Sequence, residues 1–166
     1  MISITKPILK ALYSLLSTQS TPVYSLVPDN VGQPFIYIGE VISETYDVKC
    51  NFHRNGNVNV ELFYELNEAD GSLDTMLDKL QEIKTILLPT PGFVLDLSTN
   101  GLAMSSWELD YEEGPYSYTD DRRLLTATMQ FGFLIGQTAT SANNIWGVIH
   151  GTDDVVMGTY RVIHIN

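Results

Sequence analysis

The stretch PFIYIGE, residues 34–40, decides how this chain of 166 residues folds. Its aromatic and β-branched side chains stand at consecutive positions, which is typical of a strand that is buried on both faces. We expect this strand to run from Phe35 to Tyr46 and to become more polar toward its end. A strand that begins buried and ends exposed is expected to leave the body of the protein.

The dipeptide Asn55-Gly56 is the turn signal that follows this strand, because Asn and Gly readily adopt the positive φ values of a tight turn. It predicts one long antiparallel hairpin with the arms Phe35–Asp47 and Val58–Leu66. Apart from Phe63, the return arm alternates between apolar and polar side chains. One face of the hairpin is therefore expected to join the core, and the other to contact water or a partner.

Two amphipathic helices flank the hairpin in the sequence. Thr5 is expected to cap the first and Ser72 the second, since these side chains can accept hydrogen bonds from free amides of the first turn. The apolar residues at helical spacing are Ile8, Leu12, Leu15 and Leu16 in the first helix and Leu73, Met76, Leu77, Leu80, Ile83 and Leu87 in the second. Before the hairpin, Val23–Val27 can form a short edge strand.

The chain after the second helix is dominated by strand patterns. Phe93–Leu97 and Ala103–Tyr111 flank a second turn signal, Asn100-Gly101, and Arg123–Ile135 alternates between apolar and more polar residues. Two helices over one face of such strands predict an α+β fold. We expect a mixed, mostly antiparallel sheet with both helices packed on the same face.

The C-terminal part of the sequence predicts an appended β-hairpin. A polar linker that ends at Asn144 leads to two extended runs, Ile145–His150 and Val155–Ile165, joined by Gly151–Asp154. The expected organisation is therefore one α+β domain over residues 1–136 and a hairpin over residues 137–166, packed on the same domain.

The net charge limits the partners of this protein. Twenty acidic residues against nine basic ones give a formal charge of −11. Such a surface repels phosphate backbones and releases no counterions from them, so binding to DNA is disfavoured. An acidic surface would still let DNA slide past. The N-terminal residues lack a signal-peptide layout, and the apolar runs are too short to span a bilayer, so we expect no membrane association and synthesis in the cytoplasm.

No pattern in the sequence indicates catalysis or metal binding. Cys50 is the sole cysteine and has no catalytic partner arranged around it. His53, His150 and His164 are scattered without ligand spacing, and the carboxylates between Glu108 and Asp121 lack the arrangement of a calcium loop. Nucleophile-elbow, phosphate-binding and dinucleotide-binding motifs do not occur. We therefore expect a protein that is not an enzyme and that uses no cofactor and no metal.

The order of these elements resembles the tail-terminator, or tail-completion, proteins of bacteriophages. The resemblance covers about Ile8 to Gly136 and is carried by the first helix, Val23-Tyr24 and Val27-Pro28, the stretch at residues 34–40, the polar hairpin tip, the helix over residues 73–88 and the alternating strand over residues 124–135. It implies a virion protein that forms a ring, expected to be a hexamer, caps the tail tube and joins the tail to the head.

The same resemblance implies partners and leaves alternatives open. The implied partners are the tail-tube protein and the head-completion or neck proteins, with DNA only as passing cargo, and it implies no catalytic residue. The C-terminal hairpin departs from the family pattern, so a neck or adaptor ring subunit of a divergent or short-tailed phage is the first alternative. A non-viral protein-interaction module is the second, and a small-molecule enzyme is a distant third.

The hairpin tip, about Glu44 to Asn57, is the candidate contact site. It loses the apolar alternation of its flanking arms and carries basic side chains in an otherwise acidic protein. Such a tip can project from the core and combine backbone pairing with charge complementarity on a neighbouring subunit. A surface loop without a partner is the competing interpretation. The residues expected at the contact are Tyr46, Val48, Lys49, Phe52 and Arg54.

Overall fold

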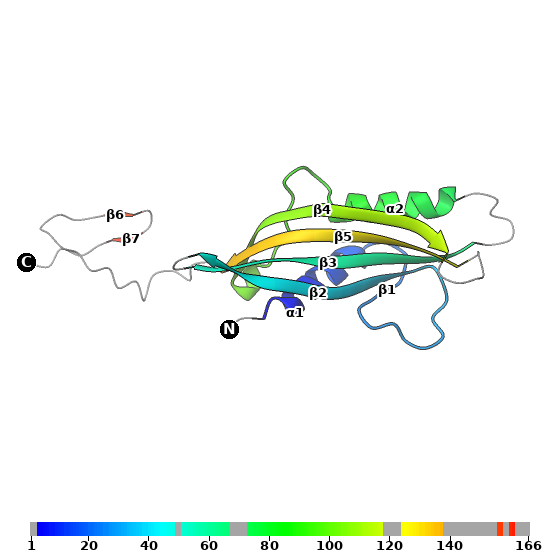
Figure 1. Cartoon of the computed structure of the whole chain (residues 1–166), viewed down its shortest axis with the longest axis horizontal. Helices are drawn as coiled ribbons and strands as arrows, with labels where there is room; N and C mark the ends of the chain where they lie inside the picture. Colours follow the sequence, from blue (N-terminus) through cyan, green and yellow to red (C-terminus); the bar gives the residue numbers. More distant parts are fainter. Residues whose placement is uncertain are drawn as a thin grey trace, which may run out of the picture.

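The computed structural model describes residues 3–48, 51–66, 73–117, 124–137, 156–157 and 160–161. In chain order the elements are α1 (Thr5–Leu16), β1 (Val23–Tyr24), β2 (Phe35–Val48), β3 (Asn51–Glu65), α2 (Asp74–Leu87), the 3-10 helix η1 (Ser98–Asn100), β4 (Leu102–Ser117), β5 (Leu124–Gln137), β6 (Val156–Met157) and β7 (Tyr160–Arg161). Figure 1 shows their arrangement.

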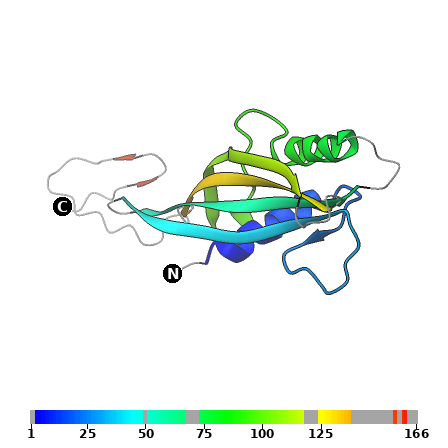
Figure 2. The ribbon, with the colours of Figure 1, turned by 45° about the vertical axis from the view of Figure 1, so that its right-hand side comes forward.

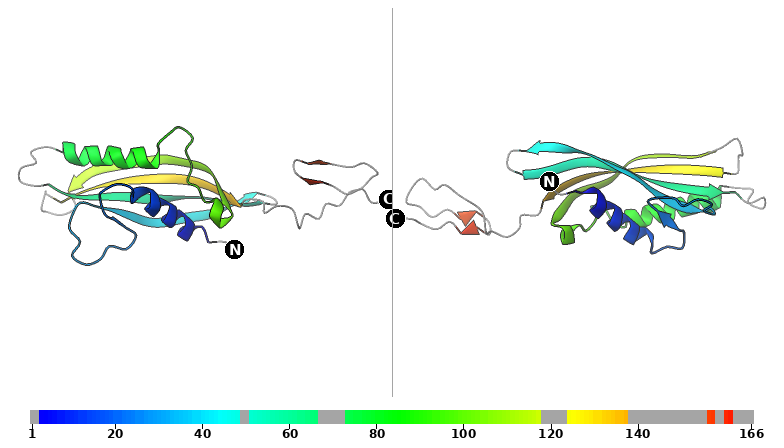
Figure 3. Two further views of the ribbon diagram at one scale, coloured as in Figure 1. Left: turned by 180° about the vertical axis from the view of Figure 1, so that it is seen from behind. Right: turned by 90° about the horizontal axis from the view of Figure 1, so that it is seen from below.

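A mixed five-stranded sheet forms the body, with the strand order β1-β2-β3-β5-β4. The short β1 runs parallel to β2, and the other neighbours are antiparallel. Both helices lie on one side of this sheet, as the views from other directions show (Figures 2 and 3). The expected α+β fold, with two helices over one face of a mostly antiparallel sheet, is confirmed.

The core lies between the helices and the covered face of the sheet. α1 buries Pro7, Ile8, Leu12 and Leu16, and α2 buries Met76, Leu80, Ile83 and Leu87. On β5, an inner strand between β3 and β4, every second residue from Leu125 to Ile135 is buried. This is the period expected of a strand that is packed on one face only. Leu73 and Leu77, also predicted to line α2's apolar side, remain 39% and 46% exposed.

Trp107 of β4 joins α2 to the sheet. Its indole Nε1–H donates a hydrogen bond to the carbonyl oxygen of Leu87 at 3.0 Å, which satisfies a carbonyl at the end of the helix. The indole ring also stacks on Phe131 with a centroid separation of 4.9 Å. At the surface, Lys84 and Glu112 form an ion pair at 3.1 Å between the same two elements.

The predicted turn at Asn55-Gly56 is wrong, because both residues lie inside β3. The ladder between β2 and β3 continues to the pair Val48 and Asn51, and Gly56 is opposite Ser43. A Cβ atom on Gly56 would stand 2.8 Å from the ring of Phe133 and would overlap the carbonyl oxygen of Ile42. Glycine is therefore needed here for close packing, and not for a positive φ.

Three other local expectations are corrected. Thr5 is the first residue of α1, Ile4 occupies the cap position, and no side chain caps the helix. Phe93–Leu97 forms no strand and leads instead into η1, which Gly101 ends with a φ of 68°. Asn100-Gly101 does turn the chain. The strand after it, β4, pairs with β5 and not with Phe93–Leu97, so the turn does not connect the two strands of a hairpin. Ser72 lies outside the described residues.

The C-terminal expectation is tested only in part. The run Ile145–His150 lies outside the described residues, as does the joining segment Gly151–Asp154. β6 and β7 are described, and they pair with each other. Both fall within the second predicted run. The described pairing therefore lies inside that run and does not join it to the first. The division of the chain at residue 136 stays a prediction.

Candidate functional site

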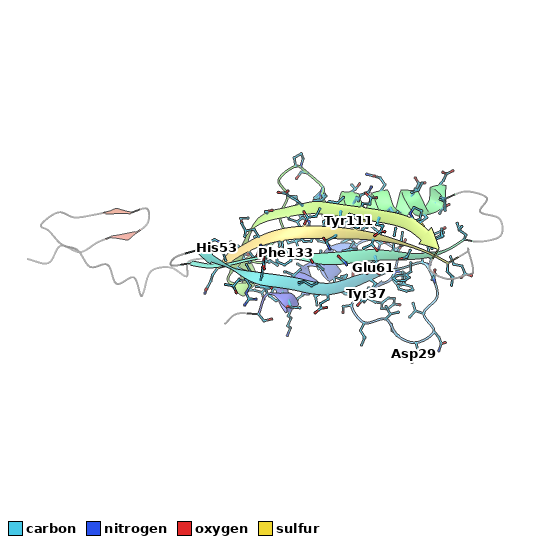
Figure 4. All side chains as sticks on the ribbon, viewed as in Figure 1. Asp29, Tyr37, His53, Glu61, Tyr111 and Phe133 are labelled. Atoms are coloured by element: carbon cyan, nitrogen blue, oxygen red, sulfur yellow. The ribbon has the colours of Figure 1, made fainter. Side chains whose placement is uncertain are left out.

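The face of the sheet that the helices leave uncovered is the candidate functional surface. We call it the open face; Figure 4 looks onto it. It arises from the strand period, since each buried residue of β3 and β5 alternates with one that points away from the helices. Its acidic residues include Glu44, Glu61, Glu65, Glu108, Asp110 and Glu113, and no lysine or arginine belongs to its described positions on β2 to β5.

The centre of the open face is a row of paired residues across four strands. Tyr37 is opposite Glu61, Glu61 is opposite Thr128, and Thr128 is opposite Glu113. Burial among its neighbours raises the pKa of the Glu61 carboxyl above its ordinary value. In the adjacent row, Gln130 Nε2 donates a hydrogen bond to Asn59 Oδ1 at 3.0 Å. The centre is therefore polar, ordered and half-buried.

A shallow hollow of about 430 Å³ lies toward the hairpin end of the open face. It forms over Gly132, where the missing side chain lets the Asp110 carboxylate lie close to the sheet. One side is apolar, with Ile42, 59% exposed, and Leu134. The other polar lining residues include Glu44, Asn55 and Glu108, and Asn55 Nδ2 donates to Glu44 Oε1 at 3.2 Å.

The opposite end of the open face is aromatic. Phe35 and Phe63 are cross-strand partners whose rings stack with centroids 4.8 Å apart. Tyr24 of β1 meets Phe35 edge to face at 5.9 Å. Such pairs add to the stability of neighbouring strands. The aromatic contacts at this end stabilise the pairing of β1, β2 and β3. At the hollow end, acidic and apolar side chains are exposed side by side.

The structure places three of the five predicted contact residues near the end of the β2–β3 hairpin. Tyr46 and Val48 belong to β2 and Phe52 to β3, whereas Lys49 lies outside the described residues. Arg54 is not at the tip: it pairs with Thr45 and Ile135 inside the sheet, and its Nη1 donates to Ser43 Oγ at 3.3 Å. The competing surface-loop interpretation does not fit residues 44–48 and 51–57, which are paired strand.

The extent of the projecting tip is smaller than expected. β5 pairs with β3 from Glu65 to His53, so most of the predicted tip is part of a three-strand ladder. Among the described residues, the pairs Asp47 with Phe52 and Val48 with Asn51 extend beyond it. Sequence reasoning missed the open-face hollow because two of its three acidic residues, Glu108 and Asp110, lie on β4, where three register shifts break the simple alternation. The polar positions of β5 were the available signal.

Charge and shape limit what this surface can do chemically. Within the described ranges, no group of three or more His, Cys, Asp or Glu residues is placed to hold a metal ion. In the same part of the chain, no helix is long and apolar enough to cross a membrane. The acidic open face is suited to contact with a complementary protein surface or to repulsion of an anionic polymer.

Comparisons with known proteins give a likeness of fold. No protein-family model matches the chain, and no curated protein matches it. Among solved structures, it is similar to a chain of the "Virion of native gene transfer agent (GTA) particle", with a TM-score of 0.54 and 9% sequence identity. The match covers 75% of this chain and 84% of that chain. At this identity the likeness shows the fold alone.

Proposed function

We propose that this chain is a structural protein of a phage-like particle, and that it forms a ring that caps the tail tube and joins the tail to the head. The observation that carries this proposal is the likeness in fold to a chain of a gene transfer agent virion over 75% of this chain. The order of elements, which resembles tail terminators, gives independent support. The proposed role involves no catalysis and no cofactor.

The surfaces described above are compatible with a ring. A closed ring joined head to tail needs two different, complementary surfaces on each subunit. The open face and the end of the β2–β3 hairpin are two different surfaces on one chain. The proposed partners are further copies of the chain, the tail-tube protein and the head-completion or neck proteins, and the proposed location is the tail or neck of a virion.

Localisation on the particle tests the role. Gold-labelled antibodies against the purified chain are expected to mark the junction between head and tail in electron micrographs of the particles. Light scattering and negative-stain averages of the purified protein are expected to show a closed ring, with six copies as the proposed number. Label on the capsid shell or at the distal tail tip would overturn the role. Label at the neck of a particle with a short tail would support the adaptor alternative instead.

The tip of the β2–β3 hairpin is proposed to contact a neighbouring subunit. Replacing residues 47–52 by Asn-Gly, between Tyr46 and His53, removes only pairs beyond the ladder with β5. The variant should keep its circular dichroism and melting temperature, because it retains every buried core residue. It should fail to join tails. A shortened protein that assembles like the intact one would exclude the tip as a contact.

The acidic charge predicts the behaviour toward DNA. A formal charge of −11 and an acidic open face make the release of counterions from a duplex unfavourable. The purified protein is therefore expected not to retard duplex DNA in gels at physiological salt. A shift that weakens as salt is added would reveal a basic surface and would contradict the proposal that DNA only passes through.

A further inference from the structure

Every lysine in the described part of the chain lies on one of the two helices, on the side of the sheet opposite to the open face (Figure 3). On α2, Lys79 and Lys84 have partners, a threonine hydroxyl at 3.3 Å and the carboxylate of Glu112 at 3.1 Å. On α1, the side chains of Lys6 and Lys10 bond to no other described residue. α1 therefore carries two cations for which the described fold supplies no partner.

The position of these lysines does not serve the helix. Lys6 is the second residue of α1, where the helix dipole leaves positive partial charge, and no acidic residue stands in the first turn. Lys6, Lys10 and the half-exposed Tyr13 follow the spacing of neighbours on a helix surface. This row, which we call the basic stripe, points away from the core, because Ile8 and Leu12 on the other side of α1 are fully buried. A charge placed against the local preference is expected where the side chain serves a contact.

The hollow of the open face has the opposite charge. Glu108 and Asp110 of β4 and Glu44 of β2 line it, and no lysine or arginine is among its described lining residues. The described hydrogen bonds to Glu108 and Glu44 come from uncharged donors, Ser106 Oγ and Asn55 Nδ2. The carboxylates therefore repel one another, and the described part of the same chain brings no cation to them.

The basic stripe fits this hollow in spacing and in composition. Lys6 and Lys10 stand one helical turn apart, about 6 Å along the axis. Glu108 and Asp110 stand two residues apart on β4, which corresponds to about 7 Å. The exposed Ile42 in the same hollow offers an apolar surface to the stems of the lysines, whose ammonium groups then reach the carboxylates. The two surfaces are complementary in charge.

We propose that the basic stripe of one copy packs on the open face of the next copy, with Lys6 and Lys10 at Glu108 and Asp110. The inference deepens the proposed ring and rests on it. A second copy is the occupant because every copy carries both complementary surfaces. α1 and the open face lie on opposite sides of one sheet, so the two do not meet within a single chain (Figures 3 and 4). They are the two unlike surfaces that head-to-tail closure requires.

The same contact accounts for two exposed side chains with large apolar parts. Tyr13 on the stripe and Ile42 in the hollow are both more than half exposed in the single chain. Each would be covered in the ring, and tyrosine is enriched in such contacts. Every sheet would then lie between its own two helices and α1 of the neighbour, which is a common layered arrangement.

Charge reversal on each surface tests the contact. Lys6→Glu with Lys10→Glu gives the stripe the sign of the hollow, and Glu108→Lys with Asp110→Lys gives the hollow the sign of the stripe. All four positions are exposed, and acidic residues near the start of α1 favour the helix, so native circular dichroism is expected. By light scattering, each double variant should be a monomer at concentrations at which the wild type forms its ring.

The quadruple variant provides the decisive measurement. It combines both reversals, so it again has opposite charges at the contact and keeps the net charge of the wild type. It should therefore form the ring, although each pair of reversals alone prevents it. A general effect of surface charge or of the substitutions on folding would not produce this rescue.

A milder pair of variants controls for net charge. Lys6→Gln with Lys10→Gln removes two cations from the stripe, and Gln81→Glu with Thr85→Glu adds two carboxylates at exposed positions of α2. Both lower the net charge by the same amount. The first should weaken ring formation at least tenfold, and the second should leave it unchanged. Equal weakening by the two would overturn the contact, because the effect would then come from net charge alone.

The proposed function and this contact fail in different ways. A wild-type protein without a ring would refute the proposed function. A wild-type ring that both double reversals still form, or a folded quadruple variant that stays monomeric, would overturn the contact alone. If the reversal at Glu108 and Asp110 unfolds the protein, Glu108→Gln with Asp110→Asn replaces it. A ring of that neutral variant as stable as the wild-type ring would equally overturn the contact.

Discussion

The covered and open faces of the same sheet show how differently one set of strands can be used. On β5, Phe131 is fully buried against Trp107, and the adjacent Gln130 is half-buried on the open side. The covered face is held by apolar packing over two helices, and the open face by polar pairs and an aromatic stack. Stability is therefore concentrated on one face, which leaves the other available for contacts.

The largest expected difference comes from truncating neighbouring residues on the two faces. Phe131→Ala should lower the free energy of unfolding by about 3–5 kcal/mol, because it removes a fully buried ring and leaves a cavity. Gln130→Ala should cost about 1 kcal/mol or less, since it loses one hydrogen bond to the half-buried Asn59. Urea unfolding measures both. Similar losses for the two variants would show that the faces are not energetically distinct.

A smaller effect is expected where the hairpin depends on a glycine. Gly56→Ala should destabilise the protein by about 1–3 kcal/mol, because the added Cβ would press on the Ile42 carbonyl and the Phe133 ring. Gly39→Ala is the matched control in the same hairpin, as its Cβ would meet Asn59 at an ordinary 3.4 Å. The control should change the stability by less than about 1 kcal/mol. Equal urea midpoints for the two variants would contradict the close packing at Gly56.

The smallest effect concerns the half-buried carboxyl group of Glu61 at the centre of the open face. Burial raises the folded-state pKa of Glu61, so folding favours its protonated form. The contribution of this group to stability is full below its ordinary pKa of 4.5 and declines as the pH rises through the folded-state value. Glu61→Gln should therefore stabilise the protein at about pH 7, by less than about 1 kcal/mol because the side chain is only half-buried and solvent screens it.

Melting temperatures of wild type and Glu61→Gln across the acidic range give the test of that sign. The advantage of the glutamine variant should shrink as the pH falls toward about 4, where the wild-type carboxyl is itself protonated. An advantage that stays constant over this range would mean that it comes from packing or hydrogen bonding. It would also mean that the charge of the Glu61 carboxylate does not lower the stability of the protein.

Patterns that depend on one element were predictable from the sequence. The spacing of Ile8, Leu12 and Leu16 identifies α1, and the alternation from Leu125 to Ile135 identifies β5 together with its buried side. Both follow from the fixed geometry of a helix and a strand. The α+β class followed from their order. The more polar positions of β5 predicted that one face of the sheet is left uncovered, but they did not predict the acidic hollow on it.

Properties that depend on contact between distant residues required the tertiary structure. Asn55-Gly56 has the local signature of a turn, yet Phe133 of another strand occupies the space beside Gly56 and holds the dipeptide in β3. Phe93–Leu97 has the pattern of a strand, but β4, the strand with which it was predicted to form a hairpin, pairs with β5 instead. Arg54 was predicted at a projecting tip because the extent of the ladder with β5 cannot be known from the hairpin alone.

The sequence by itself determined the helices, the alternating strands, the acidic charge and the side of β5 that is buried, because each of these is set by residues close together in the chain. Only the tertiary structure decided the length of the β2–β3 hairpin, the place of Gly56 and the register shifts in β4. These features depend on which strands become neighbours. That choice is made by packing across the whole core, and no single segment encodes it.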